Sequence, residues 1–308
     1  MSTSKPYNDY SSYIREKFGE RIQKISINLG LSCPNRDGTK AYGACTYCNI
    51  HTFSPDYCKP SKSVTQQLNE GISFFSLKYK TQKYFAYFQS YTNTYGEIEE
   101  IKKHYLEALS HPEVIGLVIG TRPDCISTHL LNFLEELSKK YYISLEFGVE
   151  STLNRTLELI NRCHTFEDTI NAFEMSKNRG IYLGAHIILG LPQESKDELL
   201  SHALQLSQLP IKTLKIHHLQ IVKHSLMAHQ FKEDPSFFKL FDVNEYLSFL
   251  TEFIQFLRPD IIIERFISES PPNLLIAPLW NGLKNFEFNE RLLKKCKEND
   301  IYQGLKWK

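Results

Sequence analysis

Short apolar runs alternate with helix-like stretches along most of this 308-residue chain, and this alternation constrains its fold more than any other feature. Strands are predicted over residues 24–28, 84–89, 115–120, 143–149, 183–189 and 214–221. Helices are predicted over residues 63–78, 97–109, 129–139, 153–161, 165–178 and 196–208. Strands that alternate with helices predict a parallel sheet with helices outside it, as a partial barrel or a doubly wound sheet.

The pattern changes after about Ala228. A helix is predicted over residues 243–257, and Arg258-Pro259 then interrupts it. A strand over residues 260–266 and a basic helix over residues 289–297 follow. These elements predict a small α/β extension at the C-terminal end.

Charge and cysteine content limit where the chain acts and on what. The formal net charge is +1, so no global positive field attracts nucleic acid, although a local basic face is compatible with the sequence. The seven cysteines are an odd number and no secretory segment is visible, so we expect reduced thiols and a cytoplasmic location. The apolar runs are strand-length, so no membrane span is expected.

Three cysteines, Cys33, Cys45 and Cys48, lie in a loop directly after the first predicted strand, with C-x11-C-x2-C spacing. Three thiolates on one loop can hold an iron–sulfur cluster or a zinc ion. In a 4Fe–4S cluster three thiolates leave one iron open, and an open iron can bind a cofactor. The alternative is a zinc site, because His51 follows Cys48 at a spacing that would complete a Cys3His cage.

The motif Cys45-Thr46-Tyr47-Cys48 resembles the end of the cysteine motif of the radical S-adenosylmethionine (SAM) superfamily. The eleven residues between the first two cysteines depart from the most widespread pattern of that superfamily. They are similar to a branch that includes the radical SAM half of the elongator acetyltransferase catalytic subunit and a group of small bacterial relatives. The resemblance continues in residues 120–124, 146–151, 159–164, 190–194 and 260–287.

This resemblance implies an α/β fold, a partial (βα)6 radical SAM barrel with a small C-terminal α/β extension. The expected parts are an N-terminal extension (residues 1–23), the core barrel (24–228) and the C-terminal extension (229–308). The resemblance also implies that Cys33, Cys45 and Cys48 ligate a 4Fe–4S cluster that binds SAM. In such enzymes the reduced cluster splits SAM, and a 5′-deoxyadenosyl radical abstracts hydrogen from the substrate.

By the same resemblance, several loop residues contact SAM. Tyr47 would pack on the adenine or shield the cluster, and simple loop packing is its alternative role. Gln89 and Ser90, after the second strand, would contact the amino group of SAM. Gly190 would let the backbone approach the adenine edge, unless it is an ordinary turn glycine.

Two charged residues complete the implied SAM site. Glu150 stands where relatives usually have a glutamine that bonds the ribose hydroxyls, and a carboxylate can accept the same bonds. Arg162 matches the arginine that pairs with the SAM carboxylate. The alternative is a surface ion pair between the two.

Candidate substrate contacts lie at the ends of the third and sixth strands. Arg122 and Asp124 could face the substrate or pair with each other. Strand alternation sends Lys215 and His217 to one face and His218 to the other, so the first two are candidates to line a substrate cavity. The sequence does not identify a catalytic residue.

Relatives in this branch act on the wobble uridine of tRNA, so the resemblance implies a tRNA substrate and modification of the 5-position side chain. The chain ends at Lys308, so we expect no acetyltransferase domain and favour trimming or remodelling of that side chain. Two lysine clusters could form a basic rim, at residues 59, 62, 78, 80 and 83 and at residues 294, 295, 297, 306 and 308.

A reductant such as flavodoxin or ferredoxin is an expected partner of a radical SAM enzyme. Two alternatives stay open at this point. The first is radical SAM chemistry on a small metabolite or a porphyrin-like substrate. The second is a zinc-stabilised RNA-binding protein without catalysis.

Overall fold

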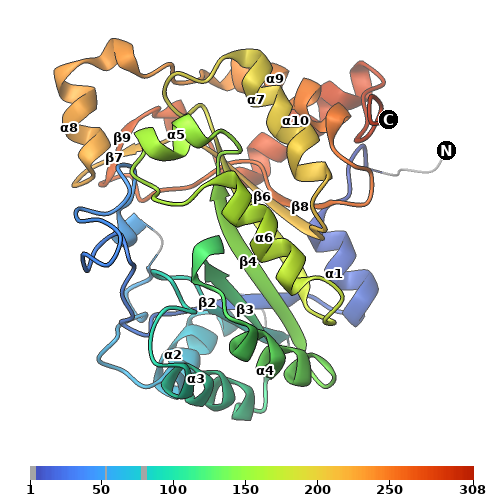
Figure 1. The fold of residues 1–308 in the computed structure, drawn as a ribbon. Coiled ribbons are helices and arrows are strands. Elements are labelled where there is room, and N and C mark those ends of the chain that lie inside the picture. The colour runs from blue at the N-terminus through green and yellow to red at the C-terminus, as the bar shows by residue number, and fades with distance from the viewer. Residues whose placement is uncertain (1–4, 53, 78–81) are drawn as a thin grey trace.

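A seven-stranded parallel sheet forms the centre of the computed structural model, which describes residues 5–52, 54–77 and 82–308 (Figure 1). The strand order is β1-β2-β3-β4-β5-β6-β8, and each strand pairs with its neighbours in parallel. The strands are β1 (Ile22–Ile27), β2 (Lys83–Phe88), β3 (Val114–Thr121), β4 (Tyr142–Glu150), β5 (Tyr182–Leu189), β6 (Thr213–His218) and β8 (Ile262–Arg265). The sheet curls into a half-barrel, which confirms the predicted α/β barrel fold.

The sixth predicted strand is too long, because the chain leaves the sheet at His218. The next two residues in extended conformation, β7 (Ile221–Val222), pair instead with β9 (Leu275–Ala277) in a separate antiparallel ribbon. The strand predicted over residues 260–266 is β8, and it joins the sheet beside β6. Seven strands therefore build the half-barrel, and the last of them comes from the C-terminal part of the chain.

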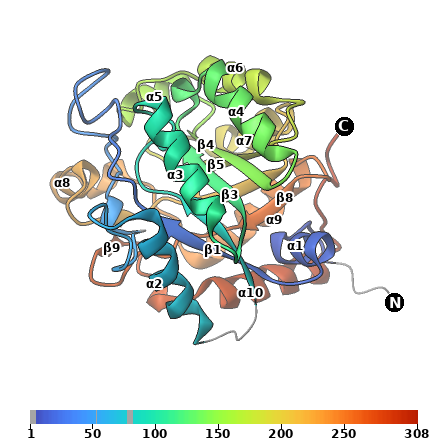
Figure 2. The ribbon, with the colours of Figure 1, turned by 90° about the horizontal axis from the view of Figure 1, so that it is seen from below.

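Helices cover the outer face of the sheet (Figure 2). They are α2 (Val64–Ser76), α3 (Ile98–Ser110), α4 (Thr128–Ser138), α5 (Asn154–Leu159), α6 (Phe166–Ser176) and α7 (Lys196–Ser207). Capping boxes begin three of them, at Ser63, Thr165 and Ser195. Each cap satisfies backbone N–H groups at the helix start and fixes where the connecting loop ends.

One helix that the sequence analysis missed, α1 (Tyr10–Phe18), lies beside both edge strands of the sheet, β1 and β8. Asp9 caps its first turn, and Gly19 ends it with a φ of 74°. The N–H of Ile263 in β8 donates to the carbonyl of Asn8 at 2.8 Å, which ties this segment to the last strand. The N-terminal segment thereby links the two edges of the half-barrel.

The C-terminal part adds α8 (Leu226–Glu233), which was not predicted, and α9 (Val243–Phe256) and α10 (Asn285–Glu298), which were. Short 3₁₀ helices occur at Ile50–Thr52, Pro123–Cys125, Pro235–Phe237 and Trp280–Gly282. Helix α9 packs against α7 and α10, so this part of the chain is continuous with the barrel. No helix in the described ranges is both long and apolar enough to cross a membrane.

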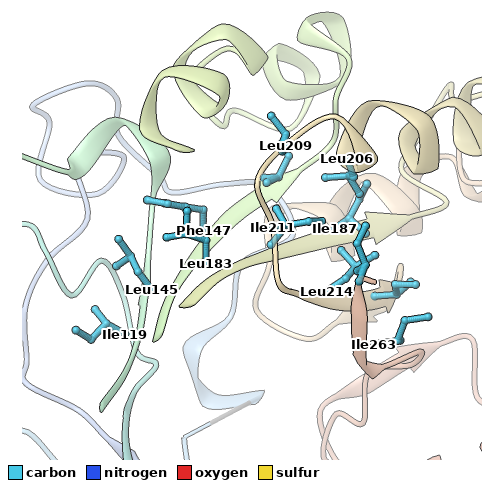
Figure 3. Close-up of a cluster of buried hydrophobic side chains, with 14 of the residues drawn as sticks. Ile119, Leu145, Phe147, Leu183, Ile187, Leu206, Leu209, Ile211, Leu214 and Ile263 are labelled. Atoms are coloured by element: carbon cyan, nitrogen blue, oxygen red, sulfur yellow. The ribbon is translucent and has the colours of Figure 1, made fainter. Parts of the chain in front are cut away.

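The main hydrophobic core fills the space between the outer face of the sheet and its helices (Figure 3). Aliphatic residues of the strands meet helix residues there, among them Leu145, Leu183, Ile187, Leu206 and Leu214. Side chains alternate between the two faces of a strand, so Glu146, His186 and Lys215, which neighbour the outward aliphatic residues Leu145, Ile187 and Leu214, point into the barrel interior. The interior is therefore where the functional groups gather.

Candidate active site

A cavity of about 270 Å³ lies at the carboxyl ends of the barrel strands, the edge of a parallel sheet where ligands usually bind. Many of the predicted site residues line it together: Cys33, Cys45, Tyr47, Cys48, Gln89, Arg122, Glu150, Arg162 and His217. The other predicted residues, Ser90, Asp124, Gly190 and Lys215, are not part of its lining. One cavity thus collects residues from the whole length of the barrel sequence.

The three cysteines lie on one wall, formed by the loop of residues 28–49 after β1, which we call the cysteine loop. Cys45 is buried, and Cys33 and Cys48 are half-buried. No group of three His, Cys, Asp or Glu side chains within the described ranges is arranged to hold a single metal ion. The side chain of His51, the fourth ligand of the zinc alternative, lies outside the described residues.

The connection between α5 and α6 holds the cysteine loop in place. The N–H of Thr46 donates to the carbonyl of Ile160 at 3.0 Å. The side-chain amide of Asn35 donates to the carbonyls of Asn161 at 2.5 Å and Arg162 at 3.1 Å. The thiols therefore sit on a loop that a distant segment of the chain fixes from behind.

Positively polarised donors point at the sulfurs. Arg162 Nη1 lies 3.6 Å from Cys45 Sγ, and Arg36 Nη2 lies 3.6 Å from Cys48 Sγ. Asn35 Nδ2 also lies 3.6 Å from Cys45 Sγ. Donors directed at thiolate sulfurs stabilise the negative charge of an iron–sulfur cluster. This set of three thiols with cationic neighbours fits the implied 4Fe–4S cluster.

Arg162 and Glu150 meet inside the cavity, so their pair is buried and not a surface ion pair. Arg162 Nη2 donates to the carbonyl of Gly148 at 2.7 Å and lies 3.4 Å from Glu150 Oε1. Arg162 Nε has no hydrogen-bond partner among the described residues. A Cβ on Gly148 would lie 2.5 Å from Glu150 Oε1 and 2.7 Å from Arg162 Nη2, so only glycine leaves room for both side chains.

The remaining predicted SAM contacts have different surroundings. Gln89 faces the cavity and accepts a hydrogen bond from Ser26 Oγ at 3.4 Å, whereas Ser90 is buried and bonds Ser54 Oγ at 3.1 Å. Tyr47 faces the cavity and also packs against a small hydrophobic cluster below it. Gly190 has a φ of 90°, and a Cβ there would lie 3.3 Å from the ring of Phe241.

Arg122 and Asp124 pair with each other, which was one of the two predicted possibilities. Arg122 Nε and Nη2 each lie 2.9 Å from a carboxylate oxygen of Asp124, and Lys40 adds a contact of 2.6 Å. Burial raises the pKa of Asp124, but Arg122 and Lys40 outweigh it and hold this pKa below its usual range. Arg122 Nη2 also donates to the carbonyl of Arg162 at 2.7 Å, so it supports the loop that carries Arg162.

Five polar residues form a network in the barrel interior, which we call the barrel floor: Lys24, Tyr87, Glu146, Lys215 and Glu264. Lys215 Nζ lies 2.6 Å from Glu146 Oε2 and 2.8 Å from the Tyr87 hydroxyl. Lys24 Nζ lies 2.7 Å from Glu264 and 3.0 Å from Glu146. Two lysines and two glutamates balance one another. Tyr87 and Glu146 of the floor also line the cavity, whereas Lys215 lies behind them in the floor and is not part of the lining.

The sequence analysis missed most of this floor and the residue next to it, His186. His186 Nε2 lies 2.9 Å from Glu146 Oε2, and burial lowers the pKa of His186. Single polar residues within apolar strands, such as Glu146 in β4 and His186 in β5, were the available signal. Such a residue cannot face a hydrophobic core without a partner, so it points to a polar interior.

His217 lines the cavity as predicted, and His218 lines it too, although alternation sends it to the opposite face. His218 is the last residue of β6, so the strand geometry no longer fixes its direction. His217 Nε2 lies 3.0 Å from Arg265 Nη2, and His217 Nδ1 lies 2.7 Å from Ser268 Oγ. Arg265 is the last residue of β8, and Ser268 lies in the loop after it. The sequence analysis did not place β8 beside β6.

Comparison with known proteins gives a family match over most of this chain. The sequence model of the radical SAM superfamily matches residues 27–206, and that of the radical SAM C-terminal domain matches residues 211–298. The protein YtqA of Bacillus subtilis is 30% identical over 303 residues, which cover 98% of this chain and 93% of YtqA.

Two further similarities involve larger proteins. The tRNA uridine(34) acetyltransferase of Methanocaldococcus infernus is 33% identical over 99 residues, which cover 32% of this chain and 16% of that protein. The structure of the archaeal Methanocaldococcus infernus Elp3 with an N-terminal deletion superposes with a TM-score of 0.68 at 16% identity. The superposition covers 92% of this chain and 64% of that one, and it shows a shared fold.

Proposed function

Because this chain belongs to the radical SAM superfamily, we propose that it is a tRNA-modifying enzyme that trims or remodels the 5-position side chain of the wobble uridine. Enzymes of this superfamily use a 4Fe–4S cluster and SAM, and reductive cleavage of SAM supplies the 5′-deoxyadenosyl radical that abstracts hydrogen. The substrate assignment is carried by the similarity to an archaeal protein named tRNA uridine(34) acetyltransferase. The fold shared with archaeal Elp3 over 92% of this chain is consistent with it.

In this proposal the cysteine loop holds the cluster through Cys33, Cys45 and Cys48. The fixed position of the loop keeps the thiols at one wall of the cavity, and the donors on Cys45 and Cys48 stabilise their negative charge. Half-buried Tyr47 between the ligands shields that wall from water.

Arg162 and Glu150 would orient SAM. The contact of 3.4 Å between them is long for an ion pair, and Arg162 Nε is unpartnered among the described residues. The guanidinium can therefore pair with the SAM carboxylate, and Glu150 can accept hydrogen bonds from the ribose hydroxyls. Gln89 lines the same cavity and is proposed to contact the SAM amino group. Ser90 and Gly190 do not line the cavity, so in this proposal they would influence SAM binding only by fixing the backbone beside it.

A tRNA substrate requires contacts with phosphates. Of the predicted lysine clusters, residues 78 and 80 lie outside the described residues, and Lys62 is engaged by Glu70 at 2.6 Å. Lys297, Lys306 and Lys308 are exposed near the C-terminal end. These lysines are proposed to bind phosphates, so tRNA affinity should fall steeply as salt rises. The electron donor is proposed to be a flavodoxin or a ferredoxin, and the location cytoplasmic.

The test is reconstitution of the full chain with iron and sulfide without oxygen, followed by incubation with SAM, dithionite and bulk tRNA from a strain that lacks this gene. We expect about four irons per chain. We also expect a mass change in a wobble-uridine nucleoside that requires SAM and reductant. The Cys45→Ala variant, treated identically, is the control for chemical reduction of the tRNA.

Three outcomes would contradict the proposal. A colourless protein that binds zinc and cleaves no SAM would favour the RNA-binding alternative without catalysis. SAM cleavage without any change in tRNA nucleosides would support radical SAM chemistry but reject tRNA as the substrate. Cleavage stimulated by a small metabolite or a porphyrin, and not by tRNA, would identify the other enzymatic alternative.

A further inference from the structure

Four side chains at the ends of β6 and β8 form a connected group on the cavity wall, which we call the β6–β8 rim: His217, His218, Arg265 and Ser268. Arg265 Nη2 lies 3.0 Å from His217 Nε2, and His217 Nδ1 lies 2.7 Å from Ser268 Oγ. The backbone N–H of Ser268 donates to His218 Nδ1 at 3.3 Å. These contacts join the four residues into one chain of hydrogen bonds.

The direction of each bond follows from which groups can only donate. Arginine has no acceptor, so His217 Nε2 accepts from Arg265 and the proton of His217 lies on Nδ1. His217 then donates to Ser268 Oγ, which leaves the Ser268 hydroxyl proton free to donate elsewhere. His218 Nδ1 accepts a backbone N–H, so its proton lies on Nε2. Burial lowers the pKa of His218 to about 3, which keeps this ring neutral with one donor.

The donors that remain have no acceptor in the protein. Arg265 Nε and His218 Nε2 are both buried, and neither has a hydrogen-bond partner in the part of the chain that the structure describes. His218 is only 3% exposed. A buried donor without an acceptor is costly, and native proteins rarely leave two in one place unless a ligand or water satisfies them.

Arg265 also differs from Arg122 and Arg162, two other arginines that line the cavity. Arg122 pairs with Asp124 at 2.9 Å, and Arg162 lies 3.4 Å from Glu150. No carboxylate of the described residues lies within ion-pair distance of Arg265. The carboxylate of Glu269, the residue after Ser268, accepts the backbone N–H of Asn285 at 2.5 Å. The rim thus places one positive charge without a carboxylate partner and two buried donors without acceptors in residues that line the cavity.

We propose that the β6–β8 rim binds an oxyanion of the substrate, and this inference rests on the proposed function. The planar guanidinium of Arg265 matches the paired oxygens of a carboxylate or a phosphate, and the Ser268 hydroxyl and His218 Nε2 supply two further donors. The oxyanion is either a carboxylate on the side chain of the modified base or a phosphate of the nucleotide. In the proposed function Arg162 binds the SAM carboxylate, so the oxyanion bound by the rim belongs to the substrate.

Trp280 provides a direct readout, because its ring stacks on His218 with centroids 4.0 Å apart. The chain has two tryptophans, so a Trp307→Phe background leaves Trp280 as the single reporter. Inorganic phosphate and acetate are titrated separately into this protein. We expect a saturable change in fluorescence, with Kd raised about tenfold by Arg265→Gln and about threefold by Ser268→Ala. Arg291→Gln, which removes an exposed arginine of α10, is the matched control.

A non-saturable response to both anions, or Arg265→Gln and Ser268→Ala proteins that titrate like the control, would overturn the proposal. Two variants are used because loss of a half-buried guanidinium can disturb folding, whereas Ser268→Ala removes only a hydroxyl. Circular dichroism of each variant identifies such a defect. A folded Ser268→Ala protein with unchanged affinity is sufficient to reject the site.

Reactions with tRNA separate the two sources of the oxyanion. If the rim binds a phosphate, Arg265→Gln lowers the slope of log affinity against log salt by about 1. If it binds a carboxylate, the slope is unchanged and the variant loses the preference for a uridine side chain that ends in an acid over its methyl ester. A variant that keeps both the slope and the preference contradicts the rim site, even where tRNA modification succeeds. Anion binding without tRNA modification contradicts the proposed function and leaves the rim site standing.

Discussion

Polar groups are paired differently on the barrel floor and at the mouth of the barrel, by which we mean the cavity wall that carries Cys45, Glu150 and Arg162. On the barrel floor, contacts of 2.6–3.0 Å connect Lys24 and Lys215 to Glu146, and the charges balance. At the mouth, the contacts of Arg162 with Glu150 and Cys45 are 3.4 and 3.6 Å long, and buried donors remain unused. Short, complete networks hold a fold together, whereas long contacts and unused donors leave room for a ligand.

This difference separates stability from function within one interior. Removal of a floor group should leave a buried charge without its partner and weaken the fold. Removal of a mouth group should leave the fold intact and remove a ligand contact. Substitutions on the two sides therefore test the comparison directly, and the expected effects range from complete loss of the cluster to a modest change in pH dependence.

The largest effect is expected at the mouth, from Cys45→Ala. Two remaining thiolates cannot hold a 4Fe–4S cluster that leaves a single iron open, so iron content should fall to background and SAM cleavage should become undetectable. Iron analysis and 5′-deoxyadenosine chromatography measure both. The matched control is Cys296→Ala, a buried thiol of α10 outside the cavity, which should keep its iron. Full iron content in the Cys45→Ala protein would remove Cys45 from the ligand set.

On the floor, Glu146→Gln should lower the free energy of unfolding by about 3–5 kcal/mol, because it leaves two buried lysines with one carboxylate between them. Urea unfolding of the iron-free protein measures this. The control is Glu136→Gln, which breaks an exposed pair with Lys139 and should cost less than about 1 kcal/mol. Equal losses for the two variants would mean that the floor network contributes no more than a surface pair.

A smaller effect, confined to binding, is expected from Arg162→Ala. Loss of the guanidinium should weaken SAM binding about 10- to 100-fold, because a charge-assisted hydrogen bond to the SAM carboxylate disappears. Iron content should stay at the wild-type level. Equilibrium binding of SAM to the reconstituted protein is the measurement, with Arg155→Ala as control, since Arg155 forms an exposed pair with Glu198 on the outside. Unchanged SAM affinity would exclude Arg162 from the SAM site.

The mouth was more predictable from the sequence than the floor, for a physical reason. The cysteine loop is a local pattern, so its spacing alone predicted three thiols on one loop after the first strand. The floor joins Lys24, Glu146 and Glu264 from strands that are far apart along the chain, and no local pattern records which strands become neighbours. The parallel pairing of β6 with β8 decides this, and it also brings Arg265 next to His217.

Local signals were also present that the sequence analysis did not use. Asp9 and Gly19 are ordinary start and stop residues for α1, but the polar, tyrosine-rich segment between them lacks a clear apolar stripe. Helix α1 is covered by the two edge strands, β1 and β8. Strand β8 lies more than 200 positions further along the chain than β1, so no local pattern records this contact. The alternation of side chains between the two faces of a strand did not predict the direction of His218, because His218 is the last residue of β6 and the strand geometry no longer fixes it.

The smallest expected effect is a pH dependence of stability that originates in Lys215. Burial lowers the pKa of Lys215 to about 8 in the folded protein, from 10.5 for an ordinary lysine. Between pH 8 and pH 10.5 the unfolded chain therefore keeps a proton that the folded protein has released, so this group favours the folded state increasingly as pH rises. Below pH 8 both states hold the proton, and the contribution no longer changes.

The free energy of unfolding of the wild type, minus that of Lys215→Gln, should accordingly rise between pH 8 and pH 10 with a slope of at most about 1.4 kcal/mol per pH unit. Burial raises the pKa of Tyr87, which contacts Lys215, well above its ordinary value, so Tyr87 stays protonated over this range. The buried thiols and the tyrosines away from Lys215 titrate in both proteins, so their contributions cancel in this difference. Urea unfolding of the iron-free proteins at pH 7, 8, 9 and 10 measures it. Lys103→Gln, at an exposed pair with Glu100, is the control and should give a flat difference. Parallel curves for wild type and Lys215→Gln would show that Lys215 keeps an ordinary affinity for its proton, and the floor would then resemble the open mouth of the barrel more than a closed network.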